Sequence, residues 1–262
     1  TTGTPHIGNY LGAIKPPINL ASDFDESFYF LADYHAIIKN SDSNAVGQSV
    51  EDIALAWLSC GLDTNKSFFY RQSDVPEILE LSWILSCVTA KGLMNRSHAY
   101  KSATSMNIDE EDKGITMGLF SYPVLMAADI LMFNATHVPV GNDQIQHIEM
   151  ARDIAQRFNH LYETLFEIPT AQVDDKSSVL TGLDGRKMSK SYNNIIPLFC
   201  SEKQLKKYIN KIKTNLLEPG QPKDPDESAV FEIWSAFASD AAIFLRKAAT
   251  CTSFLLRCTC IC

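Results

Sequence analysis

Short apolar and aromatic runs alternate along this chain with longer segments of helical periodicity, and this alternation limits the possible folds most. The strand-like runs are 27–31, 67–71 and 137–140, and the helical segments are 46–60, 77–90, 121–133 and 144–158. Pro123 falls in the first turn of its helix, where its missing N–H costs no hydrogen bond. Strands that alternate with helices form a parallel sheet with helices on both faces, so an α/β fold is predicted.

The length and composition suit one large domain followed by a small one. The chain has 262 residues, of which 45% are hydrophobic, enough to fill a core. Beyond residue 200 the strand-like runs disappear and the pattern becomes helical. We therefore predict a Rossmann-like catalytic domain at 1–197, a partial, truncated all-helical domain at 198–248 and a Cys-rich tail at 249–262 that does not belong to the fold.

Charge and cysteine usage exclude several classes of protein. The net charge of −8 argues against a general nucleic-acid coat protein but leaves room for a local basic patch. No apolar run is long enough to cross a membrane, and no secretory signal is visible. Four of the seven cysteines crowd into the last twelve residues with a spacing that suits neither zinc nor a disulfide framework. We expect reduced thiols, a cytoplasmic protein, and further residues upstream of Thr1.

The first candidate motif is His6-Ile7-Gly8-Asn9 at the start of a helix. His6 and Asn9 are three residues apart, so both side chains face one way. The first N–H groups of a helix attract phosphate, and a glycine at position 8 lets a flat base or ribose approach. Taken alone, the histidine is equally a helix cap or a surface residue.

The second candidate motif is Lys187-Met188-Ser189-Lys190-Ser191, which follows a Gly-Arg pair. Two lysines three residues apart among small hydroxyl side chains form a cationic loop that can close over a polyphosphate. A solvated basic turn is the alternative, but the co-occurrence with the first motif favours the phosphate-binding interpretation.

Together the two motifs resemble the signatures of class I aminoacyl-tRNA synthetases, with Asn9 in place of the last histidine of the first signature. Three further segments resemble the tryptophanyl branch of that family: Ala32–Ala36, Phe120–Leu131 and Val138–His147. The resemblance runs from residue 1 to about Ala248. It implies that the tryptophan carboxylate attacks the α-phosphorus of ATP. It also implies that the activated amino acid is then transferred to tRNA(Trp). His6, Asn9, Lys187 and Lys190 would be the catalytic residues.

Asp129 is the key residue of the expected amino-acid pocket. Tyr122, Met126, Asp129 and Phe133 share one face of the 121–133 helix. A carboxylate among apolar neighbours needs a partner, and an indole N–H would serve, although a structural arginine or a helix end would serve equally. The resemblance implies that Tyr122 and Gln144 hold the ammonium or carboxylate of tryptophan. It also implies that the indole lies among the remaining pocket residues, Met126, Val138, Val140 and His35.

The ATP site implied by the resemblance draws on several short segments. Gly141, Asn142 and Asp143 lie at a strand-to-helix junction, where Asp143 can accept hydrogen bonds from ribose hydroxyls. The resemblance aligns Lys101 with a lysine that reaches the phosphates. The other residues expected to contact ATP are Thr1, Thr2, Gly8, Asn9, Val179, Lys187, Met188, Ser189, Lys190 and Ser191.

A basic helix is predicted at 201–214. Its lysines cover just under half of the circumference, while Leu205, Tyr208, Ile209 and Ile212 fill the opposite side. It is either an ordinary amphipathic surface helix or a face that contacts tRNA phosphates. The residues expected to bind tRNA are Lys203, Lys206, Lys207 and Lys211.

The resemblance also implies partners and rivals. ATP would act as substrate with Mg²⁺ held by phosphate oxygens and water rather than by a protein site, and the chain would form a homodimer. Tyrosyl-tRNA synthetase shares the fold and both signatures. A small nucleotidylyltransferase shares the histidine motif but lacks the pocket helix. A catalytically dead paralogue or fragment that only binds tRNA or tryptophan is the alternative outside the enzymes.

Overall fold

The computed structural model of the chain describes residues 5–107, 110–173, 180–214 and 224–238. They fall into two compact units. The first contains residues 17–173 of the described chain, and the second contains residues 5–16, 180–214 and 224–238. The domain boundary predicted near Pro197 divides the chain differently and stays a prediction. The Cys-rich tail, 249–262, lies outside the described residues.

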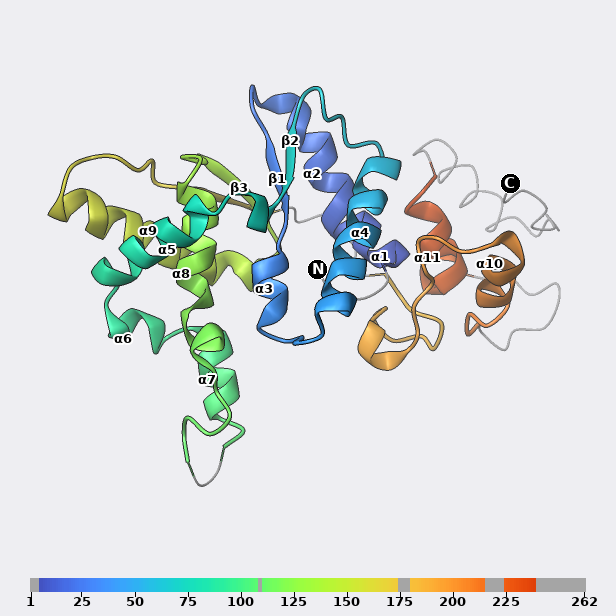
Figure 1. Cartoon of the computed structure of the whole chain (residues 1–262). Coiled ribbons are helices and arrows are strands. Elements are labelled where there is room, and N and C mark those ends of the chain that lie inside the picture. The colour runs from blue at the N-terminus through green and yellow to red at the C-terminus, as the bar shows by residue number, and fades with distance from the viewer. Residues whose placement is uncertain (1–4, 108–109, 174–179, 215–223, 239–262) are drawn as a thin grey trace. The chain divides into compact units, whose positions relative to one another are not determined.

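The strands of the first unit form two parallel pairs (Figure 1). Strand β1 (Phe28–Leu31) pairs with β2 (Phe68–Arg71), and β3 (His137–Val140) pairs with β4 (Thr170–Val173). The first three strands were predicted from their apolar runs, and the parallel α/β architecture is confirmed. Strand β4 was not predicted, because its Thr-Ala-Gln-Val sequence lacks a continuous apolar run.

The helices of the first unit supply most of its core. Fully buried side chains of α5 (Glu77–Val88), α8 (Met117–Leu131) and α9 (Ile145–Leu161) pack together, and Figure 1 shows these three helices side by side. These side chains include Ile78, Leu85, Leu131, Ile148 and Ile154. The other helices of this unit are α2 (Lys15–Leu20, which begins at the edge of the second unit), α3 (Asp33–Ile37), α4 (Ser43–Ser59), α6 (Lys91–Met94) and α7 (His98–Thr104).

Helix α8 begins four residues earlier than predicted. The side chain of Thr116 accepts a hydrogen bond from the amide of Leu119 at 3.2 Å and caps the helix. Pro123 therefore lies in the second turn and not in the first, so the prediction for Pro123 was wrong. The carbonyl of Leu119 lacks its usual helical donor there, since proline has no N–H. Phe133 lies beyond the end of α8 and stacks on Phe28 of β1.

The second unit joins the first residues of the chain to residues far along the sequence. Helix α1 (Ile7–Asn9) leads into a π-helical turn (Tyr10–Ile14), and two backbone hydrogen bonds tie this start to the 196–198 segment. The amide of Ile7 donates to the carbonyl of Ile196 at 3.0 Å, and the amide of Leu198 donates to the carbonyl of Pro5 at 2.9 Å. An apolar cluster of Leu11, Leu180, Met188, Ile196 and Ile212 stabilises the unit.

The described part of the second unit also contains the α-helices α10 (Glu202–Ile209) and α11 (Ala229–Ser235). The Ser201 hydroxyl and the Gln204 side chain form a reciprocal cap at the start of α10. The helix ends at Ile209, so the predicted extent to residue 214 was wrong. Lys211 and Ile212 lie in the turn that follows. In the described part of the chain, no helix is both long and apolar enough to cross a membrane.

Candidate active site

His6 sits at the cap position of α1. Its backbone N–H donates to Oδ1 of Asn9 at 3.1 Å, and the amide of Asn9 donates to the carbonyl of His6 at 2.8 Å. The imidazole is buried, and its Nδ1 atom has no hydrogen-bond partner. His6 and Asn9 therefore do meet at a helix start, but part of the Asn9 side chain is already used to close the turn.

Gly8 lies against the second motif. A Cβ atom at position 8 would lie 3.0 Å from the His6 ring and 3.6 Å from the sulfur of Met188. The missing side chain thus makes room for the imidazole and for Met188, which is buried in the apolar cluster. The glycine therefore allows close packing of the two motifs. The predicted approach of a base or ribose to Gly8 stays a prediction.

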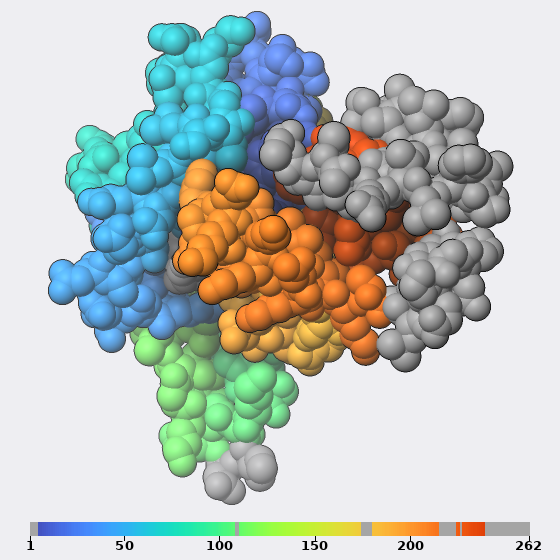
Figure 2. Space-filling model, turned by 90° about the vertical axis from the view of Figure 1, so that its right-hand side faces the viewer, coloured from blue at the N-terminus to red at the C-terminus, as the bar shows by residue number. Residues whose placement is uncertain are grey.

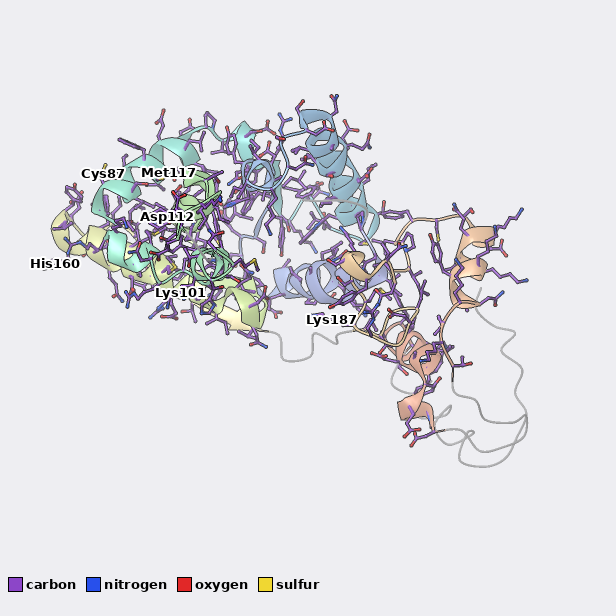
Figure 3. The ribbon with its side chains drawn as sticks, turned by 90° about the horizontal axis from the view of Figure 1, so that it is seen from below. Cys87, Lys101, Asp112, Met117, His160 and Lys187 are labelled. Carbon is purple, nitrogen blue, oxygen red and sulfur yellow. The ribbon has the colours of Figure 1, made fainter. Side chains whose placement is uncertain are left out.

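The lysine loop, which we define as Lys187–Ser191, carries its two lysines at the surface. Met188 is buried between them, and its amide donates to the carbonyl of Leu180 at 2.8 Å. Lys187 and Lys190 are exposed, and Figure 3 labels Lys187 on this loop. A buried residue between two exposed lysines fixes the backbone of the loop at the surface.

The two motifs share one electrostatic environment. Burial lowers the pKa of His6, and the positive charge of Lys190 lowers it further. Partial burial also lowers the pKa of Lys190. Both shifts favour forms with less positive charge, and burial is the first cause of each. A polyphosphate would reverse that balance, so the arrangement suits an anionic ligand.

In the first unit, a cavity of about 540 Å³ opens at the carboxyl ends of β1 and β3. Three residues predicted for the tryptophan pocket line it together: His35 from α3, Tyr122 from α8 and Gln144 from the turn after β3. The ring of His35 meets that of Tyr122 edge-on at 6.2 Å. Ligands of doubly wound sheets bind at this edge, so the cavity has the expected location.

Asp129 is buried next to this group of residues. Its Oδ2 atom lies 2.8 Å from Nε2 of His35, and its Oδ1 atom accepts a hydrogen bond from Nε2 of Gln72 at 2.7 Å. Burial raises the pKa of Asp129, while the hydrogen bonds from His35 and Gln72 oppose that shift. The protein thus supplies two partners for this carboxylate, neither of them the arginine or helix end considered from the sequence.

The other predicted pocket residues lie in the packed interior. Met126, Val138 and Val140 are half-buried and pack against the core of the first unit, and they do not line the 540 Å³ cavity. Their contact with an indole stays a prediction.

In the turn after β3, the Asp143 carboxylate lies close to the backbone of Gly141. A Cβ atom at Gly141 would lie 2.8 Å from Oδ1 of Asp143, so a side chain at 141 would shift this carboxylate. The Gln144 side chain donates to Oδ2 of Asp143 at 2.7 Å. Gly141, Asn142 and Asp143 are exposed. The turn therefore presents a carboxylate that can accept hydrogen bonds from hydroxyl groups.

The remaining predicted residues are distributed as follows. Lys101 lies on α7, exposed, as Figure 3 shows. The lysines predicted to bind tRNA are all exposed, and the segment around α10, drawn in orange, lies at the surface in Figure 2. Thr1, Thr2 and Val179 lie outside the described residues.

Sequence reasoning missed three buried polar residues: Gln72, His147 and Asn194. The Tyr122 hydroxyl hydrogen-bonds with Nε2 of His147 at 2.6 Å. Gln72 directly follows β2, and a polar residue at the carboxyl end of a parallel strand was the available signal. Asn194 carried no comparable signal.

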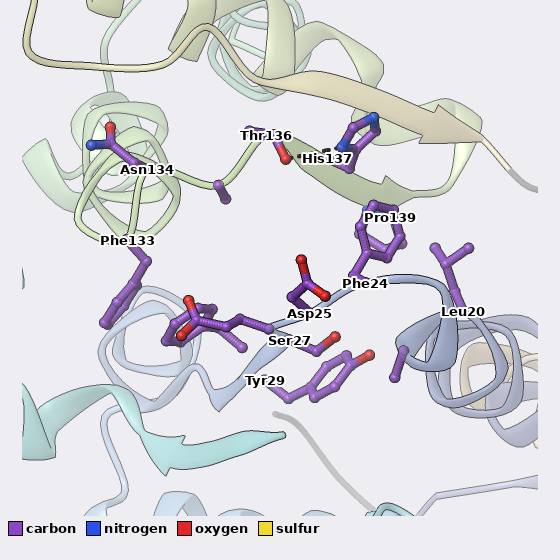
Figure 4. A pocket seen from close by; sticks show the side chains of 14 residues that line it. Leu20, Phe24, Asp25, Ser27, Tyr29, Phe133, Asn134, Thr136, His137 and Pro139 are labelled. Carbon is purple, nitrogen blue, oxygen red and sulfur yellow. Dashed lines mark hydrogen bonds between the residues drawn. The ribbon is translucent and has the colours of Figure 1, made fainter. Parts of the chain in front are cut away.

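A second cavity of about 560 Å³ lies at the opposite, amino ends of β1 and β3 (Figure 4). Phe24, Asp25, Tyr29 and His137 are among its lining residues, and it contains none of the predicted site residues. Its position at the amino ends of the strands argues against a role as the substrate site.

These features are typical of a nucleotide-binding α/β enzyme. The first unit has parallel strands with a cavity at their carboxyl ends. In the second unit, the lysine loop packs against the histidine motif. Comparison with known proteins narrows this class. The family model "tRNA synthetases class I (W and Y)" matches residues 1–230. The chain therefore belongs to the class I tRNA synthetases for tryptophan and tyrosine.

Two curated relatives and one solved structure from the tryptophan branch show this likeness. The chain is 57% identical over 256 residues to the tryptophan–tRNA ligase of Neisseria meningitidis serogroup A, covering 95% of this chain and 76% of that protein. It is 58% identical to the ligase of Pseudomonas aeruginosa, covering 91% of this chain and 55% of that protein. The crystal structure of tryptophanyl-tRNA synthetase from Campylobacter jejuni complexed with ADP and tryptophan has a TM-score of 0.85 at 44% identity, covering 94% of this chain and 75% of that one.

Proposed function

We propose that this chain activates L-tryptophan with ATP and transfers it to tRNA(Trp). The observation that carries the proposal is the buried Asp129 carboxylate, held by His35 and Gln72 beside a cavity lined by His35, Tyr122 and Gln144. A carboxylate has about four lone-pair sites, so Asp129 can accept a hydrogen bond from a ring N–H in addition to those from His35 and Gln72. The tryptophan–tRNA ligases at 57–58% identity support the same substrate.

The reaction has two steps. A carboxylate oxygen of tryptophan forms a bond to the α-phosphorus of ATP, and the bond from that phosphorus to the bridging oxygen breaks, so that pyrophosphate leaves. The terminal ribose hydroxyl of tRNA then attacks the activated carbonyl, loses its proton and releases AMP. Neither step needs a side-chain nucleophile, so catalysis is positioning and stabilisation of charge.

The two units supply different parts of this chemistry. In the second unit, His6 and Asn9 contact the phosphates, and the ammonium groups of Lys187 and Lys190 bind the leaving pyrophosphate more strongly in the transition state than in the ground state. In the first unit, Tyr122 and Gln144 hold the ammonium or carboxylate of tryptophan. Asp143, with Gly141 and Asn142, binds the ribose of ATP.

We assign magnesium to ATP itself. Within the described ranges, no three His, Cys, Asp or Glu side chains lie together where they could hold a metal ion. The cation would be held by phosphate oxygens and water, and it would neutralise charge on the phosphates. The protein's own contribution at that point is the lysine loop.

The further partners are tRNA(Trp) and a second copy of the chain. The exposed lysines on and just after α10 suit a phosphate backbone, and their contribution should fall with rising salt. We also propose a homodimer and a cytoplasmic location, which follow from membership of this family.

Tyrosine is the closest alternative substrate. The tyrosyl-tRNA synthetase of Archaeoglobus fulgidus complexed with L-tyrosine is 19% identical with a TM-score of 0.62, a likeness of fold alone. A carboxylate accepts hydrogen bonds from an N–H or from a hydroxyl group, so the preference for tryptophan over tyrosine rests on the tryptophan–tRNA ligases at 57–58% identity. A binding-only relic is disfavoured by the presence of His6, Asn9, Lys187 and Lys190.

Exchange of labelled pyrophosphate into ATP, measured with each of the twenty amino acids, tests the proposal. Circular dichroism on the same sample reports folding. Exchange with tryptophan alone is expected. Exchange with tyrosine alone would overturn the assigned pocket, and no exchange from a folded chain would favour the binding-only alternative.

A further inference from the structure

Asn194 is a buried polar side chain for which the reaction above has no role. It is 2% exposed, and its side-chain amide makes three hydrogen bonds, one accepted and two donated. Oδ1 accepts from the amide of Ser189 at 2.8 Å, while Nδ2 donates to Oδ1 of Asp184 at 2.7 Å and to the carbonyl of Lys187 at 3.1 Å. A single side chain therefore contacts the turn before the lysine loop and the loop itself.

Two of these bonds hold the backbone of the lysine loop. The Lys187 carbonyl and the Ser189 amide lie on either side of Met188, whose side chain is buried in the apolar cluster. The backbone carbonyl of Asn194 also accepts from the amide of Leu183 at 2.9 Å. The loop is thus held from both sides, by packing at Met188 and by hydrogen bonds at Asn194.

Gly182 provides the space for this side chain. A Cβ atom at position 182 would overlap Nδ2 of Asn194 and would lie 2.8 Å from its carbonyl oxygen. The amide of Gly182 donates to the carbonyl of Arg186 at 2.7 Å, which closes the turn around Asp184. A side chain at 182 would therefore displace Asn194, whose atoms are the three nearest to such a Cβ atom.

Asp184 is the charged acceptor among the hydrogen-bond partners of the Asn194 side chain, which we together call the anchor. The hydrogen bond from Asn194 is the largest cause that lowers the pKa of Asp184 to about 2, followed by the backbone amide of Arg186. The Arg186 guanidinium pairs with the same carboxylate at 2.6 Å and lies over the ring of Tyr192 at 4.3 Å. Hydrogen bonds to an ionised carboxylate are stronger than neutral ones, so this end of the anchor resists displacement.

We propose that Asn194 is a positioning residue for adenylation, which holds the Lys187 and Ser189 backbone so that both lysines of the loop meet the departing pyrophosphate. The inference rests on the proposed function of the lysine loop. Without the anchor, the ammonium groups would sample more positions. The loss would then fall on the transition state, while tryptophan binding, which uses residues of the first unit, would not change.

The test compares N194A and G182A with a matched control, N159A. Asn159 makes bonds of the same kind in the first unit: its Oδ1 accepts from the amides of Leu165 and Phe166, both at 3.0 Å, and its Nδ2 donates to the carbonyl of Phe166 at 2.8 Å. We expect N194A and G182A to lower kcat of pyrophosphate exchange on the order of 10²-fold. The KM for tryptophan should stay within about twofold, and N159A should leave both parameters within about twofold.

A pH profile separates positioning from general damage. In N194D the new carboxylic acid keeps the acceptor for Ser189 but faces the Asp184 carboxylate and the Lys187 carbonyl. Only its protonated form can donate, and the Arg186 guanidinium pairs with Asp184. The kcat of N194D relative to wild type should therefore rise as pH falls, and a ratio that is independent of pH would contradict the donor role.

Hydrogen–deuterium exchange separates a failure of the positioning role of Asn194 from a failure of the proposed function of the chain. In N194A the amides of residues 187–192 should exchange faster than in wild type, while those of α5 and α9 should not change. Failure of the wild-type chain to exchange pyrophosphate would overturn the proposed function. Unchanged protection of 187–192 in N194A, or equal losses in kcat and in tryptophan affinity, would overturn the positioning role.

Discussion

Replacing Asp129 with alanine removes the acceptor that we assign to the indole N–H of tryptophan. A hydrogen bond to a charged group contributes about 1.5–3 kcal/mol. Since 1.4 kcal/mol is tenfold in affinity, tryptophan should bind about 10- to 150-fold more weakly. ATP affinity should not change, because the residues assigned to ATP do not include Asp129. Isothermal titration of each ligand measures both quantities.

The same change affects stability, and the structure shows why. The Gln72 side chain is fully buried and donates to Asp129 at 2.7 Å, so the alanine variant leaves a buried donor unpaired. That costs about 1–3 kcal/mol of unfolding free energy. D129N, which keeps the volume and an acceptor toward Gln72, should be more stable than D129A and still bind tryptophan weakly.

A cap mutation serves as the control. Asp42 accepts hydrogen bonds from the amides of Asn44 and Ala45 at the start of α4, so D42A should cost about 1 kcal/mol without affecting tryptophan. Folded D129A with unchanged tryptophan affinity would refute the pocket assignment. An equal loss of ATP affinity would refute it as well.

Three further changes test separate parts of the account. K190A should lower the rate of adenylation by about 10²–10³-fold while tryptophan affinity is unchanged, and rapid-quench kinetics would show this; equal losses in both would remove the assigned role. I78A, at a fully buried site in the first unit, should lower the unfolding free energy by about 2–5 kcal/mol in urea titrations, and a smaller loss would mean that the core collapses around the change. The pKa of Asp184 is lowered from 3.8 to about 2, so its contribution to stability is present above pH 3.8 and disappears as pH falls through 2. The difference in Tm between wild type and D184N should shrink over that range, and a constant difference would contradict the shift.

Local signals in the sequence predicted most of the first unit. The apolar and aromatic runs at β1, β2 and β3 became parallel strands, and the helical periods became α4, α5, α8 and α9. The errors are the missed strand β4 and the ends of two helices. At α8 the Thr116 cap determined the first turn and the interior proline was tolerated, and at α10 the helix stopped at Ile209 although the pattern of lysines and apolar residues continued.

The sequence predicted the two motifs of the candidate site but not the hydrogen-bond partners of its buried residues. The histidine motif and the lysine loop stood out in the sequence, and their packing at Gly8 and Met188 agrees with a joint role. The partners of Asp129 are 94 and 57 residues away along the chain. No pattern of spacing could identify them, because the fold alone brings these side chains together.

Asn194 illustrates the same limit at short range. It lies only a few residues after the lysine loop, yet its partners are backbone groups and a turn carboxylate rather than a repeating pattern of side chains. Such an anchor is recognised from burial and from matched hydrogen bonds, and both require coordinates.

Direct detection of the proposed product tests the central claim most directly. The chain would be incubated with ATP, magnesium, tryptophan and inorganic pyrophosphatase, and the bound nucleotide would be analysed by mass spectrometry. We predict tryptophanyl-adenylate that forms only when tryptophan is present, and none when tyrosine replaces it. A folded chain that forms no adenylate with tryptophan, or that forms tyrosyl-adenylate instead, would contradict the account.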